Sequence, residues 1–227
     1  MMSFINKMLP NVSLIWPDVW QATLETLYMT IVSAIIAGIL GLALGVWLVV
    51  TDQNGITPHP VTYNILDKLV NIFRSIPFVI LLTVIYPLTK AIVGTSIGNT
   101  AALVPLVVGT IPFYARQVQT ALVQVDPGVI EAAQAMGASN VDIIFRVYLR
   151  EGLPDLIRVS VLTLISLIGL TAMAGAVGAG GLGNLAVSIG YQRYQSDVTI
   201  VAMLIILVMV FLVQGIGDWL TRRTTHV

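Results

Sequence analysis

Four long stretches without a single Asp, Glu, Lys or Arg constrain this chain more than any other feature. They cover residues 26–51, 91–115, 159–192 and 198–217. A helix needs about 20 mostly apolar residues to cross the hydrocarbon core of a bilayer. Each stretch is long enough to do so. The sequence therefore predicts an all-α membrane protein.

Composition excludes the main alternatives. Hydrophobic residues make up 57% of the chain and charged residues 10%, against about 45–50% and about 25% in soluble domains. Because the net charge is zero, the sequence lacks the basic excess of a nucleic-acid-binding protein. The absence of cysteine excludes disulfides, thiolate catalysis and Cys-ligated zinc. The two histidines, His59 and His226, lie outside the apolar stretches, so we expect no metal site.

A fifth span is predicted between the first two stretches. Residues 75–89 are free of charge but number only 15, so a full crossing must start near Leu69 and include Arg74. An arginine near a helix end can extend its charged head to the interface. Within the first span, Gly41 and Gly45 are expected to allow close packing between helices of this chain.

Positive charges predict the orientation. With the N-terminus outside, the external segments hold three Lys or Arg and the internal segments hold eight, which favours an N-out, C-in arrangement. Trp16, Trp20 and Trp219 lie where interfacial aromatic residues are common. We expect an external segment 1–19, a membrane domain 20–220 with an internal loop 117–157, and a cytoplasmic tail 221–227. The external cations are Lys7, Lys90 and Arg193; the internal ones are Lys68, Arg74, Arg116, Arg146, Arg150, Arg158, Arg222 and Arg223.

The spans lack the residues of an autonomous pump or enzyme. Their cores contain no Asp, Glu, His or Lys, which argues against a proton relay and leaves no catalytic residue. Residues 178–183 match G-x-G-x-x-G, but an apolar span precedes them and the next acid, Asp197, comes too early for a dinucleotide site. A flexible or tightly packed turn is the better interpretation. No P-loop is present, so any ATP would be hydrolysed by another subunit.

The internal loop carries the most informative pattern. Asp126 can cap a helix that begins at Pro127, and Gly137 can end it. Ser139 can cap a second helix with Asp142 three residues later. Because residues 126–137 contain two acids and no base, docking into a protein groove is favoured over a membrane-surface role. Val129, Ala133 and Met136 share one apolar face of the first helix; Val141, Ile144, Phe145, Tyr148 and Leu149 share that of the second; and Pro154 opens the fourth span.

These loop residues resemble the "EAA" loop of ATP-binding-cassette importer permeases. In that family the loop helix sits in a groove of the ATP-binding subunit. The resemblance implies a role in coupling to the ATPase for Glu131, Ala132, Ala133, Gly137, Val147 and Leu149. Val147 replaces the usual Ile, and Arg150 stands where the family pattern has Pro, so the second helix is expected to run longer here.

Further segments resemble the methionine-importer permease subfamily. The resemblance implies a type I permease fold in the bacterial inner membrane, moving methionine by alternating access. It also implies a second permease copy, two ATP-binding subunits and an external substrate-binding lipoprotein, with ATP on the partner and no cofactor on this chain. The segments are Phe73-Arg74-Ser75-Ile76-Pro77-Phe78, residues 94–98, residues 111–116, residues 129–139, residues 172–183 and residues 190–194.

Other assignments stay open at this stage. Met173, Pro77 and Ser166 are candidates for the solute path, although helix packing is the favoured explanation for Met173. Tyr191 and Tyr194 can meet an external partner or belong to an interfacial aromatic belt. The rival functions are a related permease for another amino acid or an osmolyte, and a stand-alone sodium-coupled carrier, which would leave the loop motif unexplained.

Overall fold

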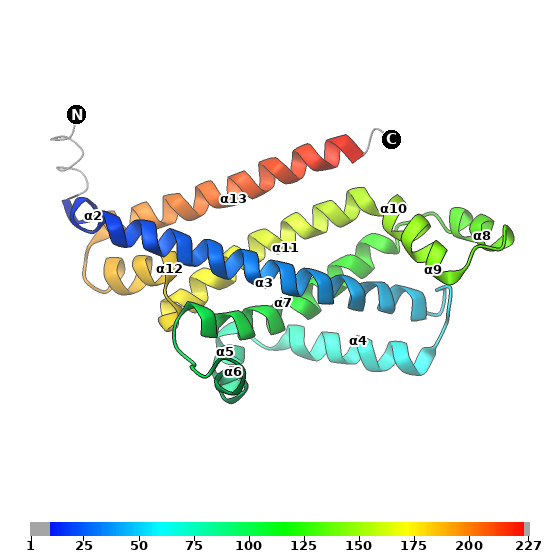
Figure 1. Cartoon of the computed structure of the whole chain (residues 1–227), viewed down its shortest axis with the longest axis horizontal. Helices are drawn as coiled ribbons and strands as arrows, with labels where there is room; N and C mark the ends of the chain where they lie inside the picture. Colours follow the sequence, from blue (N-terminus) through cyan, green and yellow to red (C-terminus); the bar gives the residue numbers. More distant parts are fainter. Residues whose placement is uncertain (1–9, 225–227) are drawn as a thin grey trace. The chain divides into compact units, whose positions relative to one another are not determined.

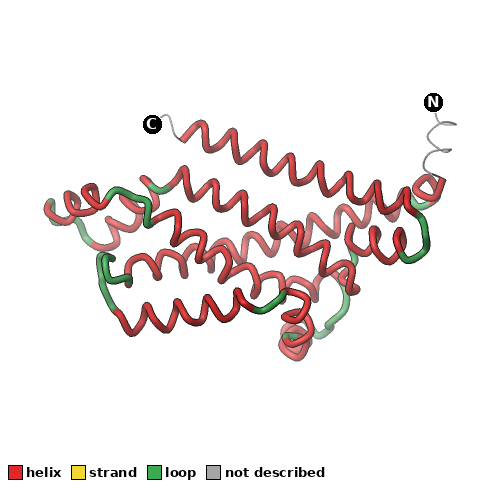
Figure 2. The backbone as a smooth tube through the Cα atoms, turned by 180° about the vertical axis from the view of Figure 1, so that it is seen from behind, coloured by secondary structure: helices red, strands yellow, loops and turns green. Residues whose placement is uncertain are grey.

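The structure is a computed structural model, and it describes residues 10–224. Within this range the chain forms helices and turns without a strand (Figure 2), as predicted. The first nine residues of the expected external segment, Lys7 among them, and His226 lie outside the described residues. The α-helices are α2 (Pro10–Leu14), α3 (Trp16–Thr51), α4 (Pro60–Ser75), α5 (Phe78–Val84), α6 (Tyr86–Val93), α7 (Asn99–Leu122), α8 (Pro127–Ala135), α9 (Asn140–Asp142), α10 (Leu149–Glu151), α11 (Leu153–Ala174), α12 (Gly181–Asn184) and α13 (Ser196–Thr224), and the π-helices are η1 (Ile143–Tyr148), η2 (Gly175–Ala179) and η3 (Leu185–Tyr191).

Within residues 10–224, four helical segments are long and apolar enough to cross a membrane: Trp16–Thr51, Asn99–Leu122, Leu153–Ala179 and Ser196–Thr224. The first is longer than predicted. Its 36 residues correspond to about 54 Å of helix at 1.5 Å per residue. That exceeds the roughly 30 Å of a hydrocarbon core, so part of α3 extends beyond it or the helix tilts.

The second predicted span is not one continuous helix. It is divided into α4, α5 and α6, with breaks at Ile76 and Ile85. Ile76 is extended, with φ −80° and ψ 120°, and Pro77 follows it. Proline disfavours the helical conformation for the residue before it, and this explains the first break. The second falls just before Tyr86-Pro87, where proline occupies the first turn of α6.

The fourth charge-free stretch contains a membrane-spanning helix and, after a turn, two further short helices. α11 and η2 end at Ala179, and the chain then turns at Gly180 into α12 and η3. At the end of the chain, α13 continues to Thr224, so the predicted tail 221–227 begins inside a helix. The Arg223 guanidinium lies 4.1 Å from the centre of the Trp219 ring in that last turn.

The chain forms two compact units. The first contains the described parts of Met1–Ile35 with Pro77–Val107 and Leu164–Val213, and the second contains Ile36–Ile76, Val108–Thr163 and the described part of Gln214–Val227. The core of the first unit includes the fully buried side chains of Met29, Leu106, Leu167, Leu182 and Val198.

The second unit packs α3 closely against α7. A β-carbon placed at Gly45 would lie 2.6 Å from the Val118 β-carbon, and one at Gly41 would lie 2.9 Å from the Tyr114 ring. Only glycine fits at such distances, so the small residues of α3 serve packing within the chain, as predicted. Val118, Leu122 and Ile143 are fully buried in the core that results.

Candidate functional site

The internal loop begins with the predicted helix cap. The Asp126 carboxylate accepts a hydrogen bond from the Gly128 backbone N–H at 2.8 Å, and Pro127 is the first residue of α8. A proline at this position has no N–H to leave unpaired, and the capping carboxylate satisfies one of the free N–H groups of the first turn. The N-terminus of α8, which Figure 1 labels, is thus set by residues that adjoin it in sequence.

The end of α8 also follows the prediction. Gly137 has a φ of +79°, its N–H donates to the Gln134 carbonyl at 2.9 Å, and the Ala138 N–H donates to the Ala133 carbonyl at 3.1 Å. This pair of bonds around a left-handed residue is the Schellman motif. A β-carbon at Gly137 would meet no atom within 4 Å, so the backbone conformation alone favours glycine.

The six motif residues divide into two groups by burial. Ala133 is buried in the core of the second unit, and Val147 and Leu149 pack against that core. Glu131, Ala132 and Gly137 are exposed. One half of the motif therefore anchors the loop, while the other half is presented at its surface.

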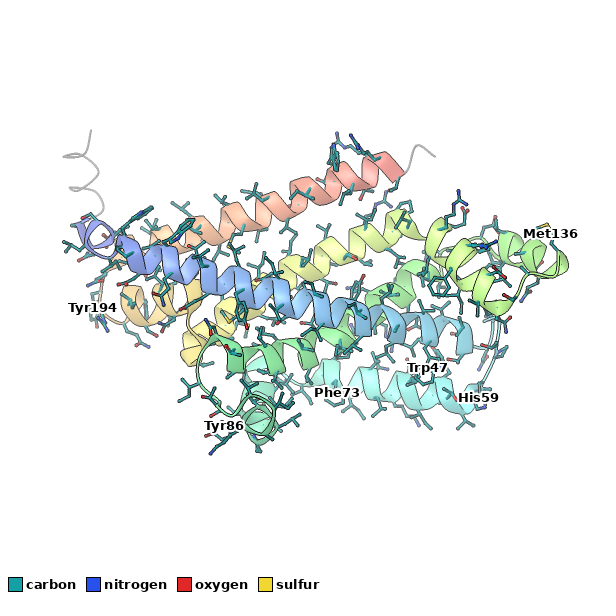
Figure 3. The ribbon with its side chains drawn as sticks, in the orientation of Figure 1. Trp47, His59, Phe73, Tyr86, Met136 and Tyr194 are labelled. Atoms are coloured by element: carbon teal, nitrogen blue, oxygen red, sulfur yellow. The ribbon has the colours of Figure 1, made fainter. Side chains whose placement is uncertain are left out.

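The predicted apolar face of α8 is divided in the same way. Ala133 is buried, but Val129 is exposed, and Met136 is 82% exposed at the tip of the loop (Figure 3). Ile130, which is partly buried, packs against the core beside Ala133 in place of Val129 and Met136. Exposed apolar side chains on a short helix are typical of surfaces that bind a partner.

The second loop helix runs without interruption from Asn140 to Glu151 through a π-helical segment. It continues through Arg150, the position at which the family pattern has Pro. Tyr148 is buried as one of the predicted face residues, whereas Val141 and Phe145 are exposed. Ile143 is fully buried although it is not among the predicted face residues. It precedes Tyr148 by five residues, a spacing that matches a π-turn and not an α-helical period.

Local electrostatics support the start of this helix. The Asp142 backbone N–H donates to the Ser139 hydroxyl oxygen at 3.2 Å, and the hydroxyl donates to the Asp142 carboxylate at 2.6 Å. The bond from Ser139 and, next, the charge of Arg146 lower the pKa of Asp142 from its ordinary value. For Tyr148, burial and then the negative charge of Asp52 raise the pKa.

An ion pair that the sequence did not reveal joins α4 to α7. The Arg116 guanidinium lies 2.6 Å from the Asp67 carboxylate and also donates to the Gln119 side-chain oxygen at 2.6 Å and to that of Asn71 at 3.1 Å. Asp67 and Arg116 are 49 positions apart, so no local spacing could pair them. This contact gives Arg116 a structural partner at the end of α7 that precedes the loop.

In the first unit, the glycine-rich turn is held by side chains of α3. The Gly181 N–H donates to the Glu25 carboxylate at 2.7 Å, and the Leu182 N–H donates to the Thr26 hydroxyl oxygen at 2.8 Å. Gly178, Gly180 and Gly181 all have positive φ. Of the two interpretations left open, the tightly packed turn is therefore the one that the structure favours.

The candidates for the solute path do not gather at one cavity. Pro77 and Met173 are exposed and Ser166 is partly buried, and none of these three described residues lines the cavity formed by α5, α6, α7 and α11. Their role stays a prediction. Tyr191 and Tyr194 are both strongly exposed. Tyr194, which Figure 3 labels, has an uncommon positive φ of 58°.

The fold and site define a class of protein: a helical membrane protein with a capped loop helix that is half anchored in the core and half exposed. Residues 41–226 match the family described as "Binding-protein-dependent transport system inner membrane component". The chain belongs to this family, and the predictions of a transport subunit and of an inner-membrane location are confirmed.

Individual relatives agree with the family. The chain is 49% identical, over 95% of its length and 96% of the relative, to the "Methionine import system permease protein MetP" of Bacillus subtilis. It is 44% identical, over 90% and 91%, to the "Probable D-methionine transport system permease protein MetI" of Vibrio cholerae. A crystal structure of the inward-facing "MetNI methionine ABC transporter" matches with a TM-score of 0.88 and 45% identity, covering 95% of this chain and 98% of that chain. The predicted type I permease fold is thereby confirmed.

Proposed function

We propose that this chain is the permease subunit of an ATP-driven importer of methionine. The observation that carries the proposal is the 49% identity to a methionine import permease along 95% of the chain. The relatives' names include both methionine and D-methionine, so we propose that the L-amino acid and also the D-amino acid are transported.

The transporter would contain a second copy of this permease, two ATP-binding subunits and an external substrate-binding lipoprotein. The exposed half of the loop motif, Glu131, Ala132 and Gly137, supports contact with the ATP-binding subunit, because exposed alanine and glycine allow a partner to approach closely. Ala133, Val147 and Leu149 would transmit the partner's movement to the core in which they are packed. ATP would bind to the partner, and this chain would carry no cofactor.

In the membrane, we propose five crossings with the N-terminus outside and the C-terminus inside. Four are the long helical segments, and the fifth is the divided segment that starts at α4. Broken helices at membrane depth are common in transporters, where irregular backbone lines a cavity and is not exposed to lipid.

The mechanism follows from the chemistry of the solute. An amino-acid zwitterion carries two charges whose desolvation in hydrocarbon is prohibitive, so the permease must offer a polar path open to one side at a time. Closure of the ATP-binding subunits would favour one of the two states through its contacts with the exposed loop residues.

Uptake of labelled methionine by cells with and without this gene, before and after ATP depletion, tests the proposal. We expect ATP-dependent uptake to be lost on deletion, and competition by unlabelled L- and D-methionine would report the enantiomer preference. Unchanged methionine uptake would contradict the substrate assignment and favour a related amino acid or osmolyte. Uptake that requires sodium but not ATP would favour the stand-alone carrier.

A further inference from the structure

The first unit contains a small cavity that the proposed function does not yet use. Residues of α5, α6, the first turn of α7 and the α11–η2 segment line it, and its volume is about 70 Å³. A cavity of about 150 Å³ can hold a benzene molecule. This one therefore has room for a group of a few heavy atoms.

Its lining combines apolar side chains with hydroxyl groups. Tyr86 at the start of α6 (Figure 3), Thr89 on the same helix and Ser96 in the following loop each contribute a hydroxyl. Among the described residues that line the cavity, none carries a charge. A group that can accept hydrogen bonds would thus meet no like charge in the lining.

The Thr89 hydroxyl is the most informative of the three. The residue is only 4% exposed and lines the cavity, and no other described residue pairs with its hydroxyl, whose oxygen is not fully enclosed by protein. Buried polar groups nearly always have a partner, because leaving one unpaired costs free energy. A hydroxyl of a buried residue that opens onto a cavity can be satisfied by a ligand in that cavity.

The N-terminus of α7 provides an independent contribution at the same cavity. Gly98, with φ +95°, directly precedes this 24-residue helix, and both Gly98 and Ala101 line the cavity. The first N–H groups of a helix have no partner within it, and the helix dipole places partial positive charge there. Helix N-termini are for this reason common sites for carboxylates and other anions.

We propose that this cavity binds the carboxylate of the transported amino acid, through the Thr89 hydroxyl and the first-turn N–H groups of α7. The amino acid as solute rests on the proposed function above, whereas the preference for an anion rests on the cavity itself. A carboxylate has the size that the cavity admits, and transporters with interrupted helices use helix N-termini to bind anionic groups of their substrates.

The first test needs no knowledge of the solute. Because the chain has no cysteine, Ser96→Cys introduces the only thiol of this chain at the cavity, and Thr95→Cys places one on the neighbouring residue, which does not line it. Each variant, in the assembled transporter, is treated with an anionic and a cationic methanethiosulfonate reagent of similar size. We expect the ratio of anionic to cationic rate to be about two- to fivefold higher for Ser96→Cys than for Thr95→Cys. An equal or lower ratio would overturn the proposal.

The second test removes the hydroxyl. Thr89→Val keeps the shape of the side chain, and we expect the KM for methionine uptake to rise about tenfold, because a hydrogen bond to a charged group is lost. Thr89→Ser restores the hydroxyl and should return the KM to within about twofold of the original. Thr83→Val is the control, since the Thr83 hydroxyl donates to the Ile80 carbonyl and the residue does not line the cavity. Uptake and basal ATPase activity of the Thr83→Val control should both match the original.

The outcomes separate this proposal from the proposed function. Normal uptake by Thr89→Val, or equal loss in Thr89→Val and Thr89→Ser, contradicts the carboxylate site while methionine transport stands. No methionine uptake by the unaltered transporter contradicts the proposed function, and the thiol rates then decide alone whether the cavity favours an anion.

Discussion

The loop around α8 and the glycine-rich turn at residues 178–183 are both short, irregular and rich in small residues, yet they are held in different ways. The loop in the second unit is shaped by its own neighbours in sequence, through Asp126, Gly137 and Ser139. The turn in the first unit is held by Glu25 and Thr26 from a helix more than 150 residues away. A locally determined loop can expose its surface to a partner, whereas a turn held from a distance depends on the packing of its unit.

Reversing the charge of the exposed motif acid should have the largest effect. Glu131→Lys is expected to abolish ATP-dependent uptake, because the exposed side chain belongs to the half of the motif proposed to contact the ATP-binding subunit, and the substitution reverses its charge. Membrane insertion and thermal stability should stay close to the original, since surface substitutions usually change stability by less than about 0.5 kcal/mol. Glu151→Lys, exposed on α10 outside the motif, is the control, and full uptake by Glu131→Lys would contradict the coupling role.

Breaking the distant support of the glycine turn should cost stability instead. Thr26→Val leaves the buried Leu182 N–H without its acceptor at nearly constant volume, and we expect a loss of about 1–3 kcal/mol in unfolding free energy. Thr23→Val, whose hydroxyl donates only to the Val19 carbonyl one turn earlier, serves as the matched control. Thermal unfolding in detergent measures both variants. Equal stability of the two would show that α3 does not hold the turn.

A substitution at the end of α8 should separate hydrolysis from uptake. Gly137→Val forces a β-branched residue into the left-handed region, at a cost of about 1–2 kcal/mol or more. We expect ATP hydrolysis to continue with less methionine moved per ATP. Gly137→Asn tolerates this conformation and should keep most of the coupling. A normal ratio of methionine to ATP in the valine variant would exclude a coupling role for the turn.

The cap of the second loop helix gives a smaller, pH-dependent effect. Ser139→Ala should destabilise the helix locally by about 1 kcal/mol, seen as faster amide exchange in residues 140–148. It should also move the pKa of Asp142 back towards the ordinary 3.8, because the hydroxyl that lowers it is lost. Since the folded pKa lies below the ordinary one, the contribution of Asp142 to stability is present above pH 3.8 and is lost as the pH falls through the folded pKa. An unchanged titration of Asp142 would rule out this role of Ser139.

The same contrast explains what the sequence could predict. Caps, glycine stops and apolar stretches depend on residues that are adjacent in the chain, so both ends of α8, the second loop helix and the four long helical segments were all predictable. The break at Ile76 has a local cause, because Pro77 follows it. The charge-free residues around this proline nevertheless led to the prediction of one continuous span. Inward positions near the π-helical segment were missed, as for Ile143, because the helical period itself changes there.

Contacts between residues far apart in the chain could not be predicted from caps, glycine positions or apolar stretches. Nothing in the spacing of the chain pairs Asp67 with Arg116 or Glu25 with Gly181, since each pair meets only after the helices pack. The same holds for the cavity at Thr89, whose lining comes from several separate segments. Residues that hold or line a site from distant parts of the chain could therefore be identified only from the structure.

The most direct test of the account is methionine accumulation in proteoliposomes that contain this chain, its ATP-binding subunit and external binding protein. We predict accumulation only when ATP and all three proteins are present, with no requirement for a sodium gradient. Accumulation driven by a sodium gradient in vesicles that contain this chain alone, without ATP, would contradict the assignment as an ATP-coupled permease.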